Sequence, residues 1–199
     1  MKVIQTLASA VGLMALAVIP VFAQQPEATN PAAPPRRAPL VLTSTAFQDS
    51  TPIPPKYTCS AQGTPVSIPL AWTEPRPGTV SFALLFHDLE AVMHKSTEDV
   101  THWMAWNIPA DVRELPEGFP PIPANVANGM QQGINSPGKT GYFGPCPGFG
   151  APHHYIFELF ALDTKLTLPP DASRSDFEKA LDGHIVGHAT LVGLFHQQQ

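Results

Sequence analysis

The chain has 199 residues, of which 43% are hydrophobic, enough for one substantial core in a single domain. Its 24 prolines exclude a helix bundle, because proline breaks helix interiors and is tolerated in loops and at strand edges. The formal net charge of -5, with no run of lysine or arginine, argues against a nucleic-acid-binding surface.

The first 23 residues have the pattern of a secretory signal peptide. Lys2 precedes an apolar stretch that ends in Val21-Phe22-Ala23, with small side chains at the -3 and -1 positions before the expected cleavage. The apolar run is interrupted and short for a membrane span, so we expect no transmembrane anchor after cleavage. The sequence therefore predicts a periplasmic or secreted protein.

Residues 24–40 are rich in proline and alanine and lack apolar periodicity, which predicts a semi-extended linker. Residues 41–196 are then expected to form a single domain. Within it, apolar segments typical of strands are separated by Pro, Gly and Asp. The expected strands are 39–47, 66–72, 79–88, 101–109, 153–163 and 184–195.

One helix is predicted after the fifth of these strands. Ser175 and Glu178 have the spacing of a capping box, and Gly183 would end the helix. About ten residues of helix against six strands indicate a mostly β protein of antiparallel sheets with peripheral helix.

The chain has two cysteines, Cys59 and Cys146. Export would place them in an oxidising compartment, where a disulfide between them is allowed. Such a bridge would close a long loop and could stabilise the fold by roughly 4 kcal/mol. Two buried free thiols remain the alternative, because a bridge requires close approach of the two Cα atoms.

Polar side chains interrupt three apolar rows at the ends of predicted strands. Because side chains alternate along a strand, each row lies on one face of the sheet. The rows are Val80, Phe82, Leu84, Phe86 and then Asp88; His102, Met104, Trp106 and Ile108; and His153, Tyr155, Phe157, Leu159 and Ala161. His154 should point to the opposite face.

Polar groups at the edge of an apolar core must bond to one another or to a ligand. If the strands 79–88 and 101–109 pair antiparallel, Asp88 would lie near His102 and accept a hydrogen bond from it. Imidazole, phenol and glycine-rich backbone N–H groups are donors, which favours a small anion such as phosphate. Asp88 could also receive an ammonium group of the ligand.

Enzymatic sites are not indicated. No HExxH-like spacing suggests a metal site, and no G-x-S-x-G suggests a hydrolase. Cys146 could serve as a nucleophile only if it were not in a disulfide. We therefore expect no catalytic residue, no metal and no cofactor.

A set of segments in fixed order resembles the phosphatidylethanolamine-binding protein family, in its bacterial Raf-kinase-inhibitor-like branch. The segments are IPPKYTCSAQG, SIPLAW, SFALLFHDLEA, THWMAWNIP, LPEGF, GINSPGKTGYFGPCPGFGAPHHYIFELFALD and GHATLVGLF. The resemblance implies a sandwich of antiparallel sheets with one or two short peripheral helices. It also implies a small pocket for phosphate, acetate or a phosphoethanolamine head group.

Carried over by position, the resemblance implies a set of ligand-binding residues. They are Asp88, His102, Gly144, Pro145, His153 and Tyr155, with Glu90 as an additional candidate. The sequence departs from the family pattern at Leu89, Glu90 and Val92, where the family has Pro, Asp and Pro. Glu90 keeps a carboxylate but is one methylene longer than the Asp of the family.

The sequence thus predicts an exported, non-catalytic binding protein for a small anion or a phospholipid head group. One alternative is a secreted interaction protein that inhibits a protease or kinase through the pocket rim. A second alternative is a weak hydrolase.

Overall fold

The computed structural model describes residues 38–92, 97–120 and 129–197. The predicted signal peptide and residues 24–37 of the predicted linker lie outside the described residues. No described helix is long and apolar enough to cross a membrane.

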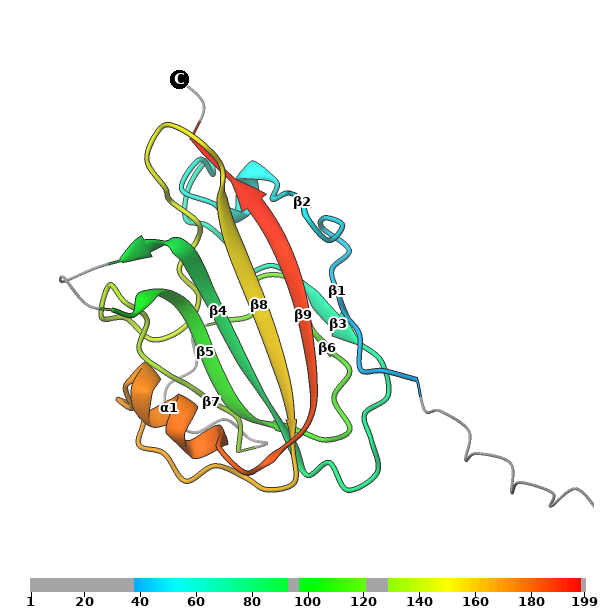
Figure 1. The fold of residues 1–199 in the computed structure, drawn as a ribbon. Helices are drawn as coiled ribbons and strands as arrows, with labels where there is room; N and C mark the ends of the chain where they lie inside the picture. Colours follow the sequence, from blue (N-terminus) through cyan, green and yellow to red (C-terminus); the bar gives the residue numbers. More distant parts are fainter. Residues whose placement is uncertain (1–37, 93–96, 121–128, 198–199) are drawn as a thin grey trace, which may run out of the picture. The chain divides into compact units, whose positions relative to one another are not determined.

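A six-stranded sheet forms the centre of the fold (Figure 1). Its order is β2 (Thr51–Pro52), β9 (Ile185–Phe195), β8 (His153–Leu162), β4 (Ser81–Val92), β5 (Asp99–Pro109) and β7 (Gln131–Gln132). The four long strands pair antiparallel, whereas β2 runs parallel to β9. The four long strands confirm the predicted segments 79–88, 101–109, 153–163 and 184–195 to within a few residues.

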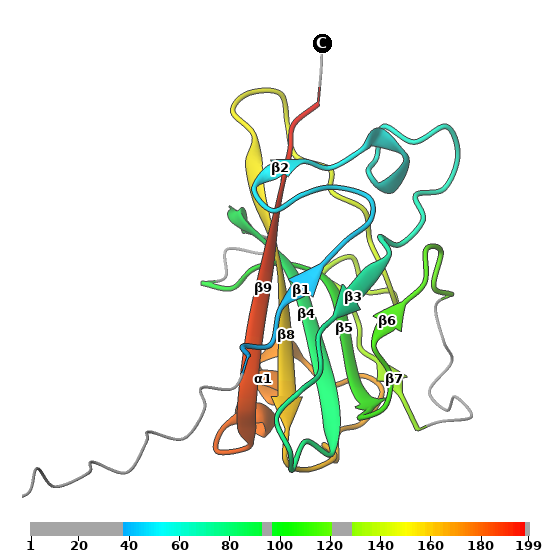
Figure 2. The same cartoon turned by 90° about the vertical axis from the view of Figure 1, so that its right-hand side faces the viewer.

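A smaller, three-stranded sheet covers one face of the central sheet (Figure 2). It consists of β1 (Leu42–Thr43), β3 (Leu70–Trp72) and β6 (Glu114–Leu115). Only short parts of the predicted strands 39–47 and 66–72 are paired, and the short strands β2, β6 and β7 were not expected. The main core lies between the two sheets, where Trp72 of β3 packs edge-on against Phe82 of β4. This mostly β, two-sheet architecture confirms the predicted fold class.

The helix α1 (Arg174–Leu181) covers the other face of the central sheet (Figure 1). Phe177 and Leu181, one turn apart on the helix, are buried in a second apolar cluster there. A short 3-10 helix at Pro55–Tyr57 is the second peripheral helix.

The predicted cap of α1 is wrong by two residues. Ser173, not Ser175, caps the helix, and Asp176 takes the place expected for Glu178 in the capping box. The earlier start brings Arg174 into the first turn, where it pairs with Asp99 of β5 and with Glu178. Gly183, with φ of 79°, follows the helix end as predicted.

Strand β5 does not alternate as expected. Phe86 pairs with Trp103 and His87 pairs with Thr101, so His102 is the extra residue of a β-bulge. In a regular ladder His102 would have faced His87 and pointed to the α1 side. The bulge turns its ring to the side between the sheets, where it contacts Phe86 and Tyr155.

The predicted row in β5 is therefore wrong. Met104 and Trp106 pack in the cluster beneath α1, whereas Ile108 lies in the core between the sheets. A second irregularity between Ala105 and Ile108 includes Asn107, whose φ is 56°. Because each of the two bulges shifts the side chains that follow it to the other face, strict alternation does not predict the faces of β5.

The cysteines form the expected disulfide. Cys59 and Cys146 are bridged, with their Cα atoms 5.2 Å apart. The bridge ties the segment after the 3-10 helix to the loop that precedes β8. The alternative of two free thiols is excluded.

Candidate anion-binding site

A cavity of about 320 Å³ lies where β4 ends and β5 and β8 begin. The loop that leads into β8 forms its far wall. The cavity is lined by Asp88, Ala91, Val100, His102, Pro137, Phe143, Cys146, Pro147, Gly148 and His153. Three of the predicted ligand-binding residues, Asp88, His102 and His153, thus come together from three strands.

Asp88 is paired with His153 rather than with His102. The Nδ1 atom of His153 lies 2.9 Å and 3.1 Å from the two carboxylate oxygens of Asp88. The side chain of Asp88 is 3% exposed and that of His153 is 24% exposed. The predicted hydrogen bond from His102 to Asp88 is wrong, because the ring of His102 is held elsewhere.

The Nδ1 atom of His102 lies 2.7 Å from the carbonyl oxygen of Phe143. Because a carbonyl can only accept, Nδ1 carries the proton of this hydrogen bond. Burial lowers the pKa of His102 to about 4, although the Phe143 carbonyl and the Asp88 charge favour the protonated ring. At neutral pH the ring is therefore uncharged, and its Nε2 atom is an acceptor.

That Nε2 atom is buried and has no hydrogen-bond partner among the residues that the structure describes. The sequence argument treated this imidazole as a donor to an anion. In the structure its Nε2 atom is instead an acceptor, so a bound ligand must donate a hydrogen bond to it. A buried acceptor of this kind calls for a ligand, a water or an ion that supplies what the protein does not.

Tyr155 lies beneath the cavity rather than in its wall. It stands opposite Asp88 in the β4–β8 ladder, and its ring lies 5.3 Å from that of His102 between centroids. Burial raises the pKa of its hydroxyl, and the Asp88 carboxylate raises it further. The hydroxyl thus remains a neutral donor, and it makes no hydrogen bond within the described part of the chain.

Gly144 and Pro145 support the loop without lining the cavity. A Cβ atom on Gly144 would lie 2.7 Å from the backbone oxygen of Tyr57 and 3.0 Å from Cβ of Pro65. The carbonyl of Pro145 accepts a hydrogen bond of 2.9 Å from the backbone N–H of Cys59. Glycine is needed here for close packing of two loops, and its role in ligand contact stays a prediction.

The sequence argument missed Phe143, whose backbone carbonyl orients His102 and whose ring stacks on it at 5.1 Å. A contact through a backbone carbonyl leaves no signal in the side-chain pattern. Cys146, Pro147 and Gly148, which are not among the predicted site residues, also line the cavity.

Glu90 lies at the rim of the cavity, outside its lining. Its carboxylate accepts a hydrogen bond of 2.7 Å from the backbone N–H of His154 and pairs with Nδ1 of the same residue at 2.6 Å. Burial opposes ionisation of Glu90, but these two contacts outweigh it and lower its pKa. The backbone N–H of Glu90 donates to Asp88 at 3.0 Å. As expected, His154 does not line the cavity.

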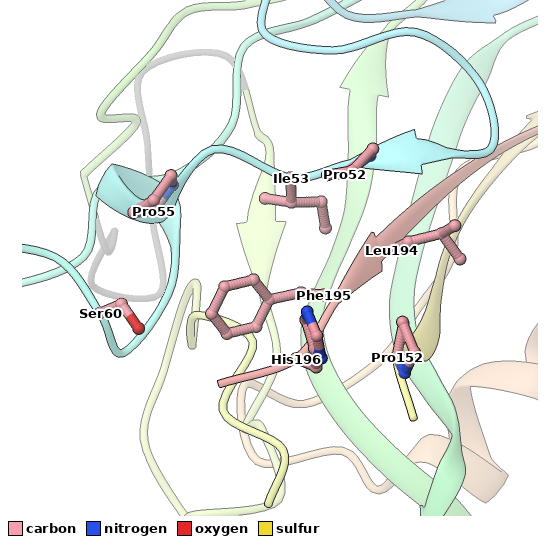
Figure 3. A pocket seen from close by; sticks show the side chains of 8 residues that line it. All are labelled: Pro52, Ile53, Pro55, Ser60, Pro152, Leu194, Phe195 and His196. Atoms are coloured by element: carbon pink, nitrogen blue, oxygen red, sulfur yellow. The ribbon is translucent and has the colours of Figure 1, made fainter. Parts of the chain in front are cut away.

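A second cavity, of about 520 Å³, contains none of the predicted site residues (Figure 3). Figure 3 shows Ile53, Leu194 and Phe195 around it, with His196 and Pro152 at its edge. Gln197 follows its wall and donates to the carbonyl of Pro147, which belongs to the lining of the first cavity. The same loop before β8 therefore takes part in both cavities.

Comparison with known proteins identifies a family model and several relatives that match most of the chain. Residues 43–196 match the family model described as phosphatidylethanolamine-binding protein. A UPF0098 protein of Methanothermobacter thermautotrophicus is 40% identical over 156 residues, covering 78% of this chain and 98% of the relative.

Two solved structures are similar over most of their length. One is the homologue CT736 of Chlamydia trachomatis, with 32% identity, a TM-score of 0.69 and coverage of 80% of this chain and 99% of the other. The second is YbcL of E. coli, described as a new member of the mammalian family, with 27% identity and a TM-score of 0.69. That match covers 81% of this chain and 100% of YbcL.

Proposed function

Because the chain belongs to the phosphatidylethanolamine-binding protein family, we propose that it is an exported protein that binds a small phosphate-bearing head group. The ligand occupies the cavity formed by Asp88, His102 and His153. Phosphoethanolamine is the head group that fits the proposal best, and the protein binds it without converting it.

One observation carries this proposal. The buried Nε2 atom of His102 has no partner among the described residues, and it lies in a cavity that also contains a His–Asp pair. The ligand must donate a hydrogen bond to Nε2. The monoanion of a phosphate monoester has a P–OH group for this contact and charged oxygens for other donors. In its doubly protonated form, His153 can donate from Nε2 to the phosphate while its Nδ1–H donates to Asp88.

The carboxylates favour a ligand that also carries a positive charge. Asp88 and Glu90 both lie at this end of the cavity, and Glu90 is the more exposed of the two. An ammonium group near them would offset their charge. A head group with both a phosphate and an ammonium suits this distribution better than free phosphate does.

The chemistry of the described cavity lining supports binding without turnover. Among the described lining residues there is no serine or threonine hydroxyl, and the cysteine thiol is bridged to Cys59. Export is supported by the signal-peptide pattern of residues 1–23 and by the disulfide, since disulfides persist in oxidising compartments.

The test is a titration of phosphoethanolamine into the full chain, followed by NMR of the imidazole resonances. We expect saturable shifts of His102 and His153, with no shift of His184, which pairs with Asp163 on the surface. His153→Gln should weaken binding at least tenfold, and His184→Gln should leave it unchanged. Unmoved His102 and His153 signals at millimolar ligand would contradict the proposal.

Phosphorus NMR of the same samples tests the non-catalytic part. We expect the phosphoethanolamine signal to persist on prolonged incubation. Appearance of inorganic phosphate that depends on the protein would show that the cavity hydrolyses its ligand.

A further inference from the structure

The negative charge beside the cavity does not suit a protein that binds only an anion. Asp88, Glu90 and His153 each place one potential metal-ligand atom within 4.8 Å of the other two. Two carboxylates at that spacing repel an incoming phosphate, and a single ammonium offsets only part of this charge. The local charges fit a ligand set for a divalent cation.

A second observation, independent of this cluster, points to the same place. His102 is 2% exposed and lines the cavity that Asp88 and His153 also line. Its Nε2 atom has no partner among the described residues, although its Nδ1 atom is firmly held by the Phe143 carbonyl. A water bound to a metal ion is a strong hydrogen-bond donor and would satisfy this acceptor.

We propose that Asp88, Glu90 and His153 bind a divalent transition-metal ion of the Mn²⁺ or Zn²⁺ type. Two carboxylate oxygens and one imidazole nitrogen suit such an ion, whereas Ca²⁺ prefers a set made only of oxygens. Three protein ligands leave positions open for water or for an exogenous oxygen. His102 acts next to the metal, accepting a hydrogen bond from the water or ligand that it holds.

The cation also accounts for the carboxylates in the proposed function. It binds one phosphate oxygen of the head group and thereby replaces the repulsion from Asp88 and Glu90 by an attraction. This bridging step rests on the proposed function, whereas binding of the cation does not.

The contacts of the free site are compatible with this arrangement. The proton that Nδ1 of His153 shares with Asp88 is replaced by the metal, as is usual for a histidine ligand. The side chain of Glu90 is 39% exposed at the rim, so it can turn from His154 toward the cavity.

The first experiment titrates Mn²⁺ alone into the full chain after treatment with a chelator. We expect saturable paramagnetic broadening of the His102 and His153 resonances at one equivalent, while His184 stays sharp. Glu90→Gln should weaken Mn²⁺ binding at least tenfold, by the range typical for loss of groups that support a metal site. The matched control is Asp163→Asn, which removes the carboxylate of a surface His–Asp pair of 2.9 Å and should change nothing.

Two results would overturn the cation site. One is the lack of any saturable broadening at millimolar Mn²⁺. The other is equal Mn²⁺ affinity in Glu90→Gln and in the unchanged protein. Glu90 is exposed enough that its amide variant should fold, and thermal unfolding of both variants checks this.

The second experiment separates this inference from the proposed function. Phosphoethanolamine is titrated with Zn²⁺ present and with chelator present, and at least tenfold tighter binding is expected with Zn²⁺. Equal affinity under both conditions would refute the bridging role and leave the proposed function standing. Cation binding with no phosphoethanolamine binding under either condition would support the metal site and refute the proposed function.

Discussion

His102 shows how one residue changes its chemical role between sequence and structure. As a histidine at the start of an apolar row, it was expected to donate to an anion or to Asp88. In the fold, a backbone carbonyl takes its Nδ1 proton and burial keeps the ring neutral. The ring therefore presents the lone pair of Nε2 to the cavity, and a ligand at this position must donate a hydrogen bond to it.

Because the pKa of His102 is lowered in the fold, we expect the free energy of unfolding to depend on pH. The unfolded chain takes up this proton near pH 6.5, whereas the folded protein resists it down to about pH 4. In this interval the unfolded state binds more protons, so the free energy of unfolding should fall as the pH is lowered. The contribution of this group is about 2–3 kcal/mol.

Urea unfolding of chelator-treated protein between pH 4 and pH 7 measures this effect. The variant His102→Gln should show a shallower dependence of the unfolding free energy on pH over the same range. Identical pH profiles for the variant and the unchanged protein would mean that His102 titrates normally in the fold.

At the scale of single elements, the loop before β8 and the bulge in β5 build the cavity together. The bulge turns His102 toward the space between the sheets, and the loop provides the carbonyl that holds it. Cys146, Pro147 and Gly148 of the same loop close the wall. Neither element would form the site alone.

The substitution Gly144→Ala tests whether close packing of this loop against Tyr57 contributes to stability and to ligand binding. Gly144→Ala should destabilise the protein by about 1–3 kcal/mol, because the new methyl group would meet the Tyr57 carbonyl at 2.7 Å and force the backbone to shift. It should also weaken phosphoethanolamine binding, since Phe143 is the adjacent residue. Thermal or urea unfolding and the NMR titration measure the two effects.

Gly148→Ala is the matched control in the same loop. No atom lies within 4 Å of a Cβ atom at Gly148, so the substitution should change the stability by less than about 0.5 kcal/mol. If both alanine variants behave alike, the tight approach of Gly144 to Tyr57 does not limit the fold.

At the scale of the whole described domain, the disulfide is a covalent long-range constraint. It joins positions 87 residues apart and fixes the loop whose residues line the cavity. Removing it should lower the free energy of unfolding by about 2–5 kcal/mol, mostly by freeing the unfolded chain.

Urea unfolding with and without a reducing agent measures this contribution. The double variant Cys59→Ser/Cys146→Ser should match the reduced protein and should not respond to the reducing agent. Equal unfolding midpoints for the oxidised and reduced protein would contradict the prediction.

Much of the fold followed from local patterns. The four long strands, the main helix and its end at Gly183 are encoded by apolar periodicity and by glycine, so the sequence predicted them within a few residues. The short strands β6 and β7 could not be predicted, because two residues carry no periodicity and pair only where neighbours bring them together. The helix cap was misplaced because two serines two residues apart both offered the capping pattern.

The sequence by itself predicted that Asp88, His102 and His153 gather at one end of a β fold, because each stands at the end of a predicted apolar strand. For His102 the predicted row was wrong, and the bulge in β5 brings its ring to this side. Only the tertiary structure decided their pairing. The bulge in β5, the Phe143 carbonyl and the register of β4 with β8 pair Asp88 with His153. They leave Nε2 of His102 without a partner in the part of the chain that the structure describes. A hydrogen bond to a backbone carbonyl and the register between two strands leave no signal in the pattern of apolar and polar side chains.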